Sequence, residues 1–336
     1  MKSIGIDLGT ANTLIYMKGR GIVLREPSVV AVEIKNKKVL ATGNEAKNML
    51  GKAPDSIEVY RPLKNGVIAE FDITAKMLNA FFKRVTGTVM MFNRPIVVIC
   101  IPNGVTDVEK RAVEDATLEA GAKSVALIEE PIAAAIGAGL PVSNAHGSMI
   151  VDIGGGTTEI AVLSLGGIVG STSCKVAGDE LDEAIVDYVR QKYNVLIGEP
   201  TAELVKKTIG AVHPDIQQEK REIRGRNLYT GLPASVILDT ADVIEAMRDP
   251  INQIVTAIKR TLEDTPPELA GDIFDRGIMC AGGGAMLKGL AALLGEETGI
   301  KTHIAKRPLD CVADGIGVVL DDLDSHESVL SFVKSR

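Results

Sequence analysis

The chain has 336 residues and a formal net charge of −7, and its basic residues are dispersed, which excludes nucleic acid as a main partner. Hydrophobic residues make up 46% of the sequence, enough for two cores of ordinary size. The sequence enters a strand pattern almost at once and has no apolar run of the ~20 residues that span a bilayer, so we expect a cytoplasmic protein without a signal peptide.

The first predicted element is a strand, a tight turn and a second strand between Ile4 and Ile15. An apolar run reaches Asp7, and Gly9 and Thr10 follow before the apolar pattern resumes. Glycine permits a positive φ and lets backbone N–H groups approach an anion, and the threonine hydroxyl adds a donor. A turn of this kind binds phosphate, but a structural hairpin has the same pattern, so one copy is weak evidence.

A more polar stretch from about residue 32 to residue 70 predicts a small subdomain inserted in the first domain. Asp72 is predicted to cap the helix that follows, in which apolar residues recur at every fourth position: Ile73, Met77, Phe81 and Val85. The first domain therefore combines strands with at least one long amphipathic helix.

Three large apolar residues, Met90, Met91 and Phe92, stand in the loop after this helix. Composition favours the interpretation that they tuck under the neighbouring helix. The alternative is a wedge for a membrane surface or a partner, with Lys83 and Arg94 beside it to meet anionic headgroups.

Glu130 is predicted to lie at or next to the N-cap of a helix, because Pro131 and three alanines follow it. It also follows the carboxyl end of a predicted strand, where ligands of open α/β sheets collect. Two roles are about equally supported by the spacing. Glu130 is either a plain capping carboxylate or a carboxylate that orients a water for attack on a γ-phosphate.

A second copy of the first turn begins at Val151. Asp152 ends an apolar run, three glycines and then Thr157 and Thr158 follow, and the strand pattern resumes. A carboxylate at a strand end suits a hard cation, directly or through its water shell, better than it suits phosphate. Two such turns that face each other across a cleft would clamp one Mg-nucleotide between two similar domains.

The second half is predicted to contain helices over 181–193 and 202–209, a mixed polar region over 210–249 and a helix from Ile251. Glu203 and Lys206 lie on the second of these helices, where a solvated face is the default. A strand then leads to the triple glycine Gly282 to Gly284, which would let a flat or anionic group approach the backbone. A last helix is expected over 312–320, and the polar tail after Asp321 is expected to be frayed.

Five segments stand in the order found in the ATPase superfamily of actin, the heat-shock chaperone ATPases and hexokinase, and the chain resembles that superfamily. They are residues 7–13, 129–139, 152–158, 282–286 and 311–320. Within the superfamily, four stretches resemble the MreB and Mbl family of bacterial actins, which control cell shape. They are residues 6–13, 25–30, 66–69 and 265–269.

This resemblance implies an α/β, actin-like ATPase fold, in which two duplicated RNase H-like domains enclose a nucleotide cleft and each carries a smaller inserted subdomain. Domain I would comprise residues 1–143 and 309–336, with its insertion at about 32–70. Domain II would comprise residues 144–308, with its insertion at about 180–250.

The resemblance also implies site residues for ATP and Mg²⁺. Asp7 and Asp152 would organise Mg²⁺ through its waters, and Glu130 with Thr157 would place the attacking water. The phosphates would be held by Thr10, Ala11, Asn12, Gly154, Gly155, Gly156 and Thr157. The nucleoside would be lined by Glu203, Lys206, Gly282, Gly283, Gly284, Ala285 and Met286.

The implied function is a cytoskeletal ATPase that polymerises into membrane-associated filaments and organises cell-wall elongation to set rod shape. Its partners would be further copies of itself, the inner face of the cell membrane and membrane proteins of the wall-elongation machinery. Members bind membrane through an apolar loop at Met90, Met91 and Phe92, and some add an N-terminal amphipathic helix that this sequence lacks.

Two other functions are compatible with the superfamily. A metabolic kinase would need an acceptor pocket and a base for a substrate hydroxyl, and the only candidate base lies near Glu130. A chaperone-type ATPase would need a peptide-binding domain, which we do not expect in this chain.

Overall fold

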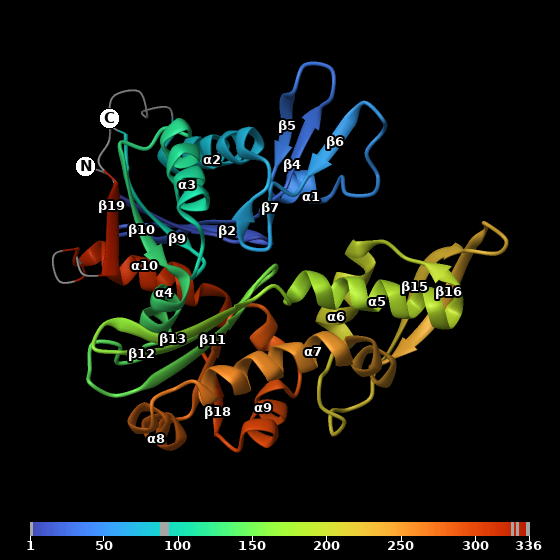
Figure 1. Ribbon diagram of the computed structural model, residues 1–336. Coiled ribbons are helices and arrows are strands. Elements are labelled where there is room, and N and C mark those ends of the chain that lie inside the picture. Colours follow the sequence, from blue (N-terminus) through green and yellow to red (C-terminus); the bar gives the residue numbers. More distant parts are fainter. Residues whose placement is uncertain (1–2, 88–93, 324–325, 327–328, 334–336) are drawn as a thin grey trace.

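We describe the protein from a computed structural model, which covers residues 3–87, 94–323, 326 and 329–333 (Figure 1). Met90, Met91 and Phe92 lie outside the described residues, so the membrane contact predicted for them stays a prediction. Within the described part of the chain, no helix combines the length and the apolar character needed to cross a membrane.

A six-stranded sheet forms the upper half of the molecule in Figure 1, in the order β19-β10-β9-β1-β2-β3. Strands β1 to β3 are an antiparallel meander, and β9 and β10 continue the sheet parallel to β1. The strands are β1 (Ser3–Leu8), β2 (Asn12–Met17), β3 (Gly21–Pro27), β9 (Ile96–Ile101), β10 (Ser124–Glu129) and β19 (Leu330–Val333).

A five-stranded sheet in the lower half repeats this arrangement, in the order β13-β12-β11-β17-β18. Strands β11 to β13 form an antiparallel meander, and β17 and β18 continue the sheet parallel to β11. The strands are β11 (Ser148–Ile153), β12 (Thr158–Ser164), β13 (Gly167–Cys174), β17 (Ile278–Ala281) and β18 (Thr302–Ile304). The predicted second copy of the strand-turn-strand unit is therefore confirmed.

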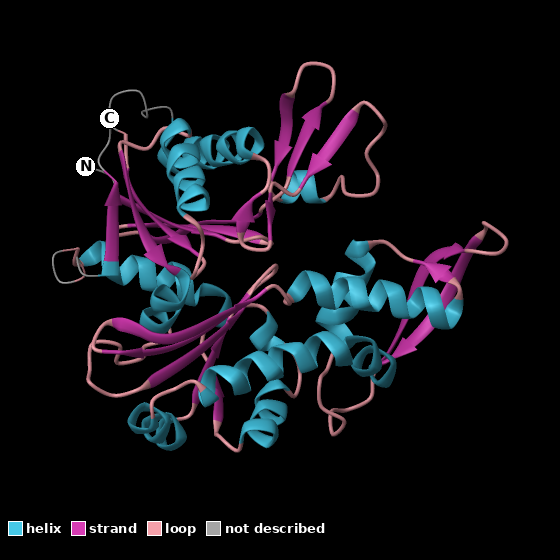
Figure 2. Ribbon diagram, viewed as in Figure 1, coloured by secondary structure: helices cyan, strands magenta, loops and turns pink. Residues whose placement is uncertain are grey.

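Two helices lie between the sheets, α4 (Glu130–Gly137) and α10 (Cys311–Asp321) (Figures 1 and 2). They share a buried apolar cluster with both sheets, which includes Val98 of β9 and Ile150 of β11. The backbones of α4 and α10 come so close that a Cβ atom on Gly315 would lie 1.9 Å from the carbonyl oxygen of Ala133. This contact joins the two halves of the molecule and places the start of α4 between them.

The outer faces of the sheets are covered by other helices (Figure 2). Helices α2 (Phe71–Thr86) and α3 (Asp107–Glu119) pack on the first sheet through a core that includes Phe81 and Phe82. The second sheet is covered by α7 (Thr240–Glu263), α8 (Pro267–Arg276) and α9 (Leu290–Thr298). Two 3-10 turns, η2 (Gly284–Met286) and η3 (Pro308–Asp310), complete this half.

Two groups of smaller elements project to the right in Figure 1, one from each half. The upper group contains β4 (Val30–Glu33), β5 (Lys38–Thr42), α1 (Asn44–Lys47), β6 (Ile57–Tyr60), β7 (Leu63–Lys64) and β8 (Val67–Ile68). The lower group contains α5 (Gly178–Tyr193), β14 (Val195–Leu196), α6 (Glu199–Ile209), β15 (Lys220–Asn227) and β16 (Pro233–Asp239). The domain and insertion boundaries given above stay a prediction.

Three local predictions were wrong. The helix expected from Ile251 begins at Thr240, because Asp239 caps it by accepting from the N–H of Asp242 at 2.9 Å and buried apolar residues carry it through Pro250. Asp72 lies in the first turn of α2, whose N-cap is Glu70. The tail is not frayed throughout, because β19 gains backbone hydrogen bonds as an antiparallel edge strand beside β10.

Candidate functional site

The two predicted phosphate turns meet between the sheets. A Cβ atom on Gly155 would lie 2.6 Å from Cβ of Ala11, and one on Gly156 would lie 2.7 Å from Oγ1 of Thr10. Atoms at such distances overlap, so only glycine allows the second turn to approach the first this closely. The two copies of the turn therefore lie in direct contact in the folded chain.

Each turn is closed by the same backbone hydrogen bond. The N–H of Gly9 donates to the carbonyl of Asn12 at 3.1 Å, and the N–H of Gly154 donates to the carbonyl of Thr157 at 2.9 Å. The equivalent bonds keep the chain bent sharply between two strands. The structure thus brings the residues predicted to hold phosphate, 10–12 and 154–157, to one place.

A third turn, which the sequence reasoning did not assign to the site, touches both of these turns. The N–H of Gly66 donates to Oγ1 of Thr10 at 2.9 Å, and a Cβ atom on Gly66 would lie 3.1 Å from Cγ2 of Thr157. Asn65 and Gly66 both have positive φ, at 49° and 78°. The Asn-Gly pair is the hairpin signal that could have identified this turn.

Four carboxylates gather beside the turns. Asp7 and Asp152 stand near the ends of β1 and β11, Glu130 begins α4, and Glu159 lies on β12 opposite Asp152. Asp152 and Glu159 are buried, at 3% and 1% exposed, while Asp7 and Glu130 are half-buried. Charges this close in a buried site disfavour the ionised form of each other.

The pKa values of this carboxylate cluster follow that expectation. Burial raises the pKa of Asp7 to about 7, although the thiol of Cys100, 3.5 Å away, lowers it. Burial and the charges of Asp7 and Glu159 raise the pKa of Asp152 to about 8. The pKa of Glu130 is also raised well above its usual range, by burial first and by Asp152, Asp7 and Glu159 next.

This carboxylate cluster fits a hydrated cation. No lysine or arginine is among the groups that shift the pKa of these four carboxyls. Among the described residues, no three histidine, cysteine, aspartate or glutamate side chains are grouped closely enough to hold a metal ion. Carboxylate oxygens are donors that suit Mg²⁺, which usually keeps several waters and shares phosphate oxygens.

Without nucleotide and divalent cation, the protein should become less stable as pH rises from about 4 to about 8. In that window folded Asp7 and Asp152, with pKa values of about 7 and about 8 against an ordinary 3.8, bind more protons than the unfolded chain, so the free energy of unfolding falls. Asp152→Asn, which removes one of these two titrating groups, should be more stable than wild type at a pH of about 8.5. Thermal unfolding in EDTA across this range measures both effects, and a wild-type Tm that climbs throughout the window would contradict them.

The triple-glycine turn packs on the end of β11. Gly282 has φ +80°, and a Cβ atom there would lie 2.3 Å from Oδ1 of Asp152. A Cβ atom on Gly284 would lie 2.2 Å from Cγ2 of Ile153, while the side chain of Met286 is 59% exposed. The turn predicted to line the nucleoside, 282–286, therefore adjoins the second phosphate turn.

Lys206 lies beside the second phosphate turn. Its Nζ donates to the carbonyl of Gly178 at 2.5 Å and pairs with Asp182 at 2.8 Å. A Cβ atom on Gly178 would in turn lie 3.5 Å from Cα of Gly155. The structure thus connects α6, through the start of α5, to the predicted phosphate site.

Glu203, one turn earlier on α6, faces the upper half of the molecule. It pairs with Lys47 of α1 at 2.7 Å and with Lys207 at 2.6 Å. Burial raises the pKa of Glu203, but the two lysines outweigh it and bring the pKa down to about 2. Arg61 forms a second ion pair, with Glu199 at 2.9 Å. Two ion pairs therefore link the upper group of smaller elements to α6.

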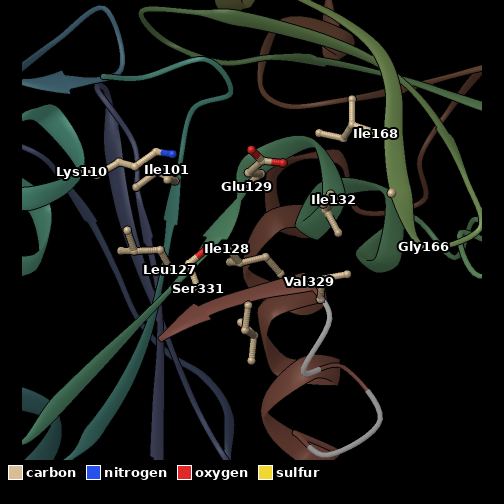
Figure 3. Close-up of a pocket in the computed structure, with 12 residues that line it drawn as sticks. Ile101, Lys110, Leu127, Ile128, Glu129, Ile132, Gly166, Ile168, Val329 and Ser331 are labelled. Atoms are coloured by element: carbon tan, nitrogen blue, oxygen red, sulfur yellow. The ribbon is translucent and has the colours of Figure 1, made fainter. Parts of the chain in front are cut away.

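A separate cavity of about 260 Å³ is lined in part by the end of β10 and the start of α4 (Figure 3). Its lining includes Glu129, Ile132 and Lys110, and none of the residues predicted for nucleotide. Glu129 therefore faces this cavity, whereas the next residue, Glu130, belongs to the carboxylate cluster.

Comparison with known proteins identifies the family. The family described as MreB/Mbl protein matches residues 1–328. The cell shape-determining protein MreB of Escherichia coli (strain K12) is 53% identical over 327 residues, which cover 96% of this chain and 94% of that protein. The cell shape-determining protein Mbl of Bacillus subtilis (strain 168) is 49% identical over 323 residues, which cover 96% and 97%.

Solved structures agree with the fold. MreB5 of Spiroplasma citri bound to ADP superposes with a TM-score of 0.92 at 37% identity, over 97% of this chain and 98% of that one. The MamK double helical filament, at 22% identity, shares the fold with a TM-score of 0.81 over 96% and 99% of the two chains. The predicted actin-like α/β fold is confirmed, and the chain belongs to the MreB/Mbl protein family.

Proposed function

We propose that this protein is an actin-like cytoskeletal ATPase that polymerises into filaments and organises cell-wall elongation to set rod cell shape. The observation that carries the proposal is the meeting of two duplicated glycine turns beside four buried or half-buried carboxylates. The E. coli and B. subtilis relatives, at about half identity over nearly the whole chain, are cell shape-determining proteins.

The proposed ligand is ATP with Mg²⁺. Solved structures of MreB5 contain ADP in one case and AMPPNP in another, which supports nucleotide binding by this chain. Residues 10–12 and 154–157 would hold the phosphates with their N–H and hydroxyl groups, and Asp7 and Asp152 would hold Mg²⁺ through its waters. When bound, Mg²⁺ supplies positive charge that neutralises the phosphates and the cluster. Glu203, Lys206 and residues 282–286 would line the nucleoside.

Glu130 and Thr157 are the residues we assign to hydrolysis. The start of α4 fixes Glu130 between the two sheets, where its carboxylate can accept a hydrogen bond from the attacking water. Thr157, 6% exposed at the end of the second turn, offers a hydroxyl to the same water. Hydrolysis would be slow in the monomer and faster in the filament if polymer contacts change the angle between the halves and bring Glu130 into line.

Filaments would lie on the inner face of the cell membrane, with Met90, Met91 and Phe92 as the contact, and would meet membrane proteins of the elongation machinery. The apolar character of those three residues and the neighbouring cations Lys83 and Arg94 support this.

Pelleting with Mg-ATP tests the proposal. Wild-type protein should sediment above a threshold concentration, and with liposomes at lower concentrations. The variant Asp152→Asn, which loses half of the proposed cation site, should stay in the supernatant while keeping its fold by circular dichroism. Protein that remains monomeric at every concentration, with and without liposomes, contradicts the filament proposal, and rapid ATP turnover on adding a sugar or acetate would point to a kinase instead.

A further inference from the structure

Glu159 has no role in the proposed site, yet it is among the most deeply buried charged residues of the described chain, at 1% exposed. It lies on β12 directly opposite Asp152 in the antiparallel register. Glutamate is almost never buried this completely unless it is paired. The described residues give it no lysine or arginine partner.

The two carboxylate oxygens of Glu159 differ in their contacts. Oε1 accepts a hydrogen bond from the hydroxyl of Ser173, on the neighbouring strand β13, at 2.7 Å. Oε2 is buried and has no hydrogen-bond partner among the described residues. A buried acceptor that lacks a partner is rare in folded proteins and indicates a place for a water or a ligand.

The surroundings of Glu159 locate this place in the proposed hydrolytic site. Burial raises the pKa of Glu159, and hydrogen bonds from Ser173, from the backbone N–H of Asn103 and from the hydroxyl of Thr157 lower it. The charge of Glu159 in turn raises the pKa of Glu130. Glu159 therefore neighbours both residues that we assign to the attacking water.

Asn103 adds a connection between the halves of the molecule. It follows β9 of the first sheet, whereas Glu159 and Ser173 belong to the second sheet. The side-chain amide of Asn103 also donates to the hydroxyl of Ser171 on β13. Residues of both sheets thus contact the carboxylate of Glu159. A change in the angle between the sheets would therefore alter these contacts.

We propose that Glu159 is a positioning residue for ATP hydrolysis, and that its free Oε2 accepts a hydrogen bond from the water that Glu130 and Thr157 orient. This inference rests on the proposed function. In the reaction, the water oxygen bonds to the γ-phosphorus, the bond from that phosphorus to the bridging oxygen of ADP breaks, and the water proton passes to Glu130. Glu159 keeps its charge throughout and fixes the direction of the second water hydrogen.

The test replaces Glu159 by glutamine, which keeps the shape and an oxygen for Ser173 but presents an N–H₂ group where Oε2 stood. Single-turnover hydrolysis at saturating Mg-ATP should fall at least roughly tenfold. Affinity for ADP should stay within about twofold, because Oε2 is not assigned to the ground-state nucleotide. Affinity for ADP with aluminium fluoride, which mimics the γ-phosphate in transfer and retains the water, should fall together with the rate.

Two further variants keep the test decisive. Ser173→Ala, at an exposed position of β13, keeps the Glu159 carboxylate but removes the hydrogen bond that holds its orientation. This variant should slow hydrolysis severalfold at unchanged ADP affinity. Glu114→Gln, on α3 away from the site, is the matched control and should change neither quantity.

The outcomes separate the inference from the proposed function. Normal hydrolysis in Glu159→Gln, or a loss of hydrolysis accompanied by an equal loss of ADP affinity and a lower Tm, overturns the positioning role. Wild-type protein that binds neither ADP nor AMPPNP overturns the proposed function itself, before any variant is compared.

Discussion

Replacing Gly315 with alanine should destabilise the folded protein by about 3 kcal/mol or more. The new Cβ would lie 1.9 Å from the carbonyl oxygen of Ala133 and 3.0 Å from the backbone nitrogen of Gly137, and these backbone atoms cannot rotate away. The helices α4 and α10 would have to separate, which would disrupt the buried cluster that they share with both sheets. Gly137→Ala should behave in the same way, because its Cβ would lie 1.8 Å from the carbonyl oxygen of Cys311.

Urea unfolding monitored by circular dichroism measures the change. The matched control is Gly271→Ala on α8, where an added Cβ would have no atom within 4 Å and the site is exposed. This control should gain about 0.5–1 kcal/mol from the better helix propensity of alanine. Equal stability of wild type and Gly315→Ala would show that the two helices do not pack as closely as described.

Glu130→Gln should lower the single-turnover rate of ATP hydrolysis by roughly 100-fold to 10,000-fold. The amide cannot accept the proton of the attacking water, whereas it preserves the size of the side chain at the start of α4. Nucleotide affinity should be maintained or increase, because the change removes one negative charge from the carboxylate cluster.

Glu129→Gln is the control for this prediction. Glu129 precedes Glu130 and is the N-cap of α4, but it lines the separate cavity shown in Figure 3. Its hydrolysis rate should stay within about threefold of wild type, since its side chain makes no capping hydrogen bond. Similar losses in both variants would mean that α4 as a whole, rather than the Glu130 carboxylate, supports hydrolysis.

The sequence was most informative where a function depends on local backbone geometry. The turns at Asp7 and Asp152 could be predicted because aspartate, glycine and threonine stand at fixed intervals between two apolar runs. Glu130 could be placed next to a helix start because Pro131 follows it, and α4 does begin at Glu130. The roles of these residues in hydrolysis and cation binding stay predictions.

Features that depend on contacts between distant residues could not be predicted in the same way. Nothing local to Gly315 identifies α4 as the helix against which it packs. Glu159 looks like an ordinary polar residue of a strand, and only the fold buries it beside Asp152 and Glu130. The edge strand β19 was missed because its four residues are stabilised by pairing with β10 rather than by a pattern of their own.

The central claim is that two copies of one turn bind a single Mg-nucleotide between the two sheets. Diffraction from crystals grown with Mg²⁺ and AMPPNP tests it most directly. The account predicts triphosphate density between residues 10–12 and residues 154–157, with Mg²⁺ linked through waters to Asp7 and Asp152. Nucleotide density that contacts only one of the two turns, or that lies away from both aspartates, would contradict it.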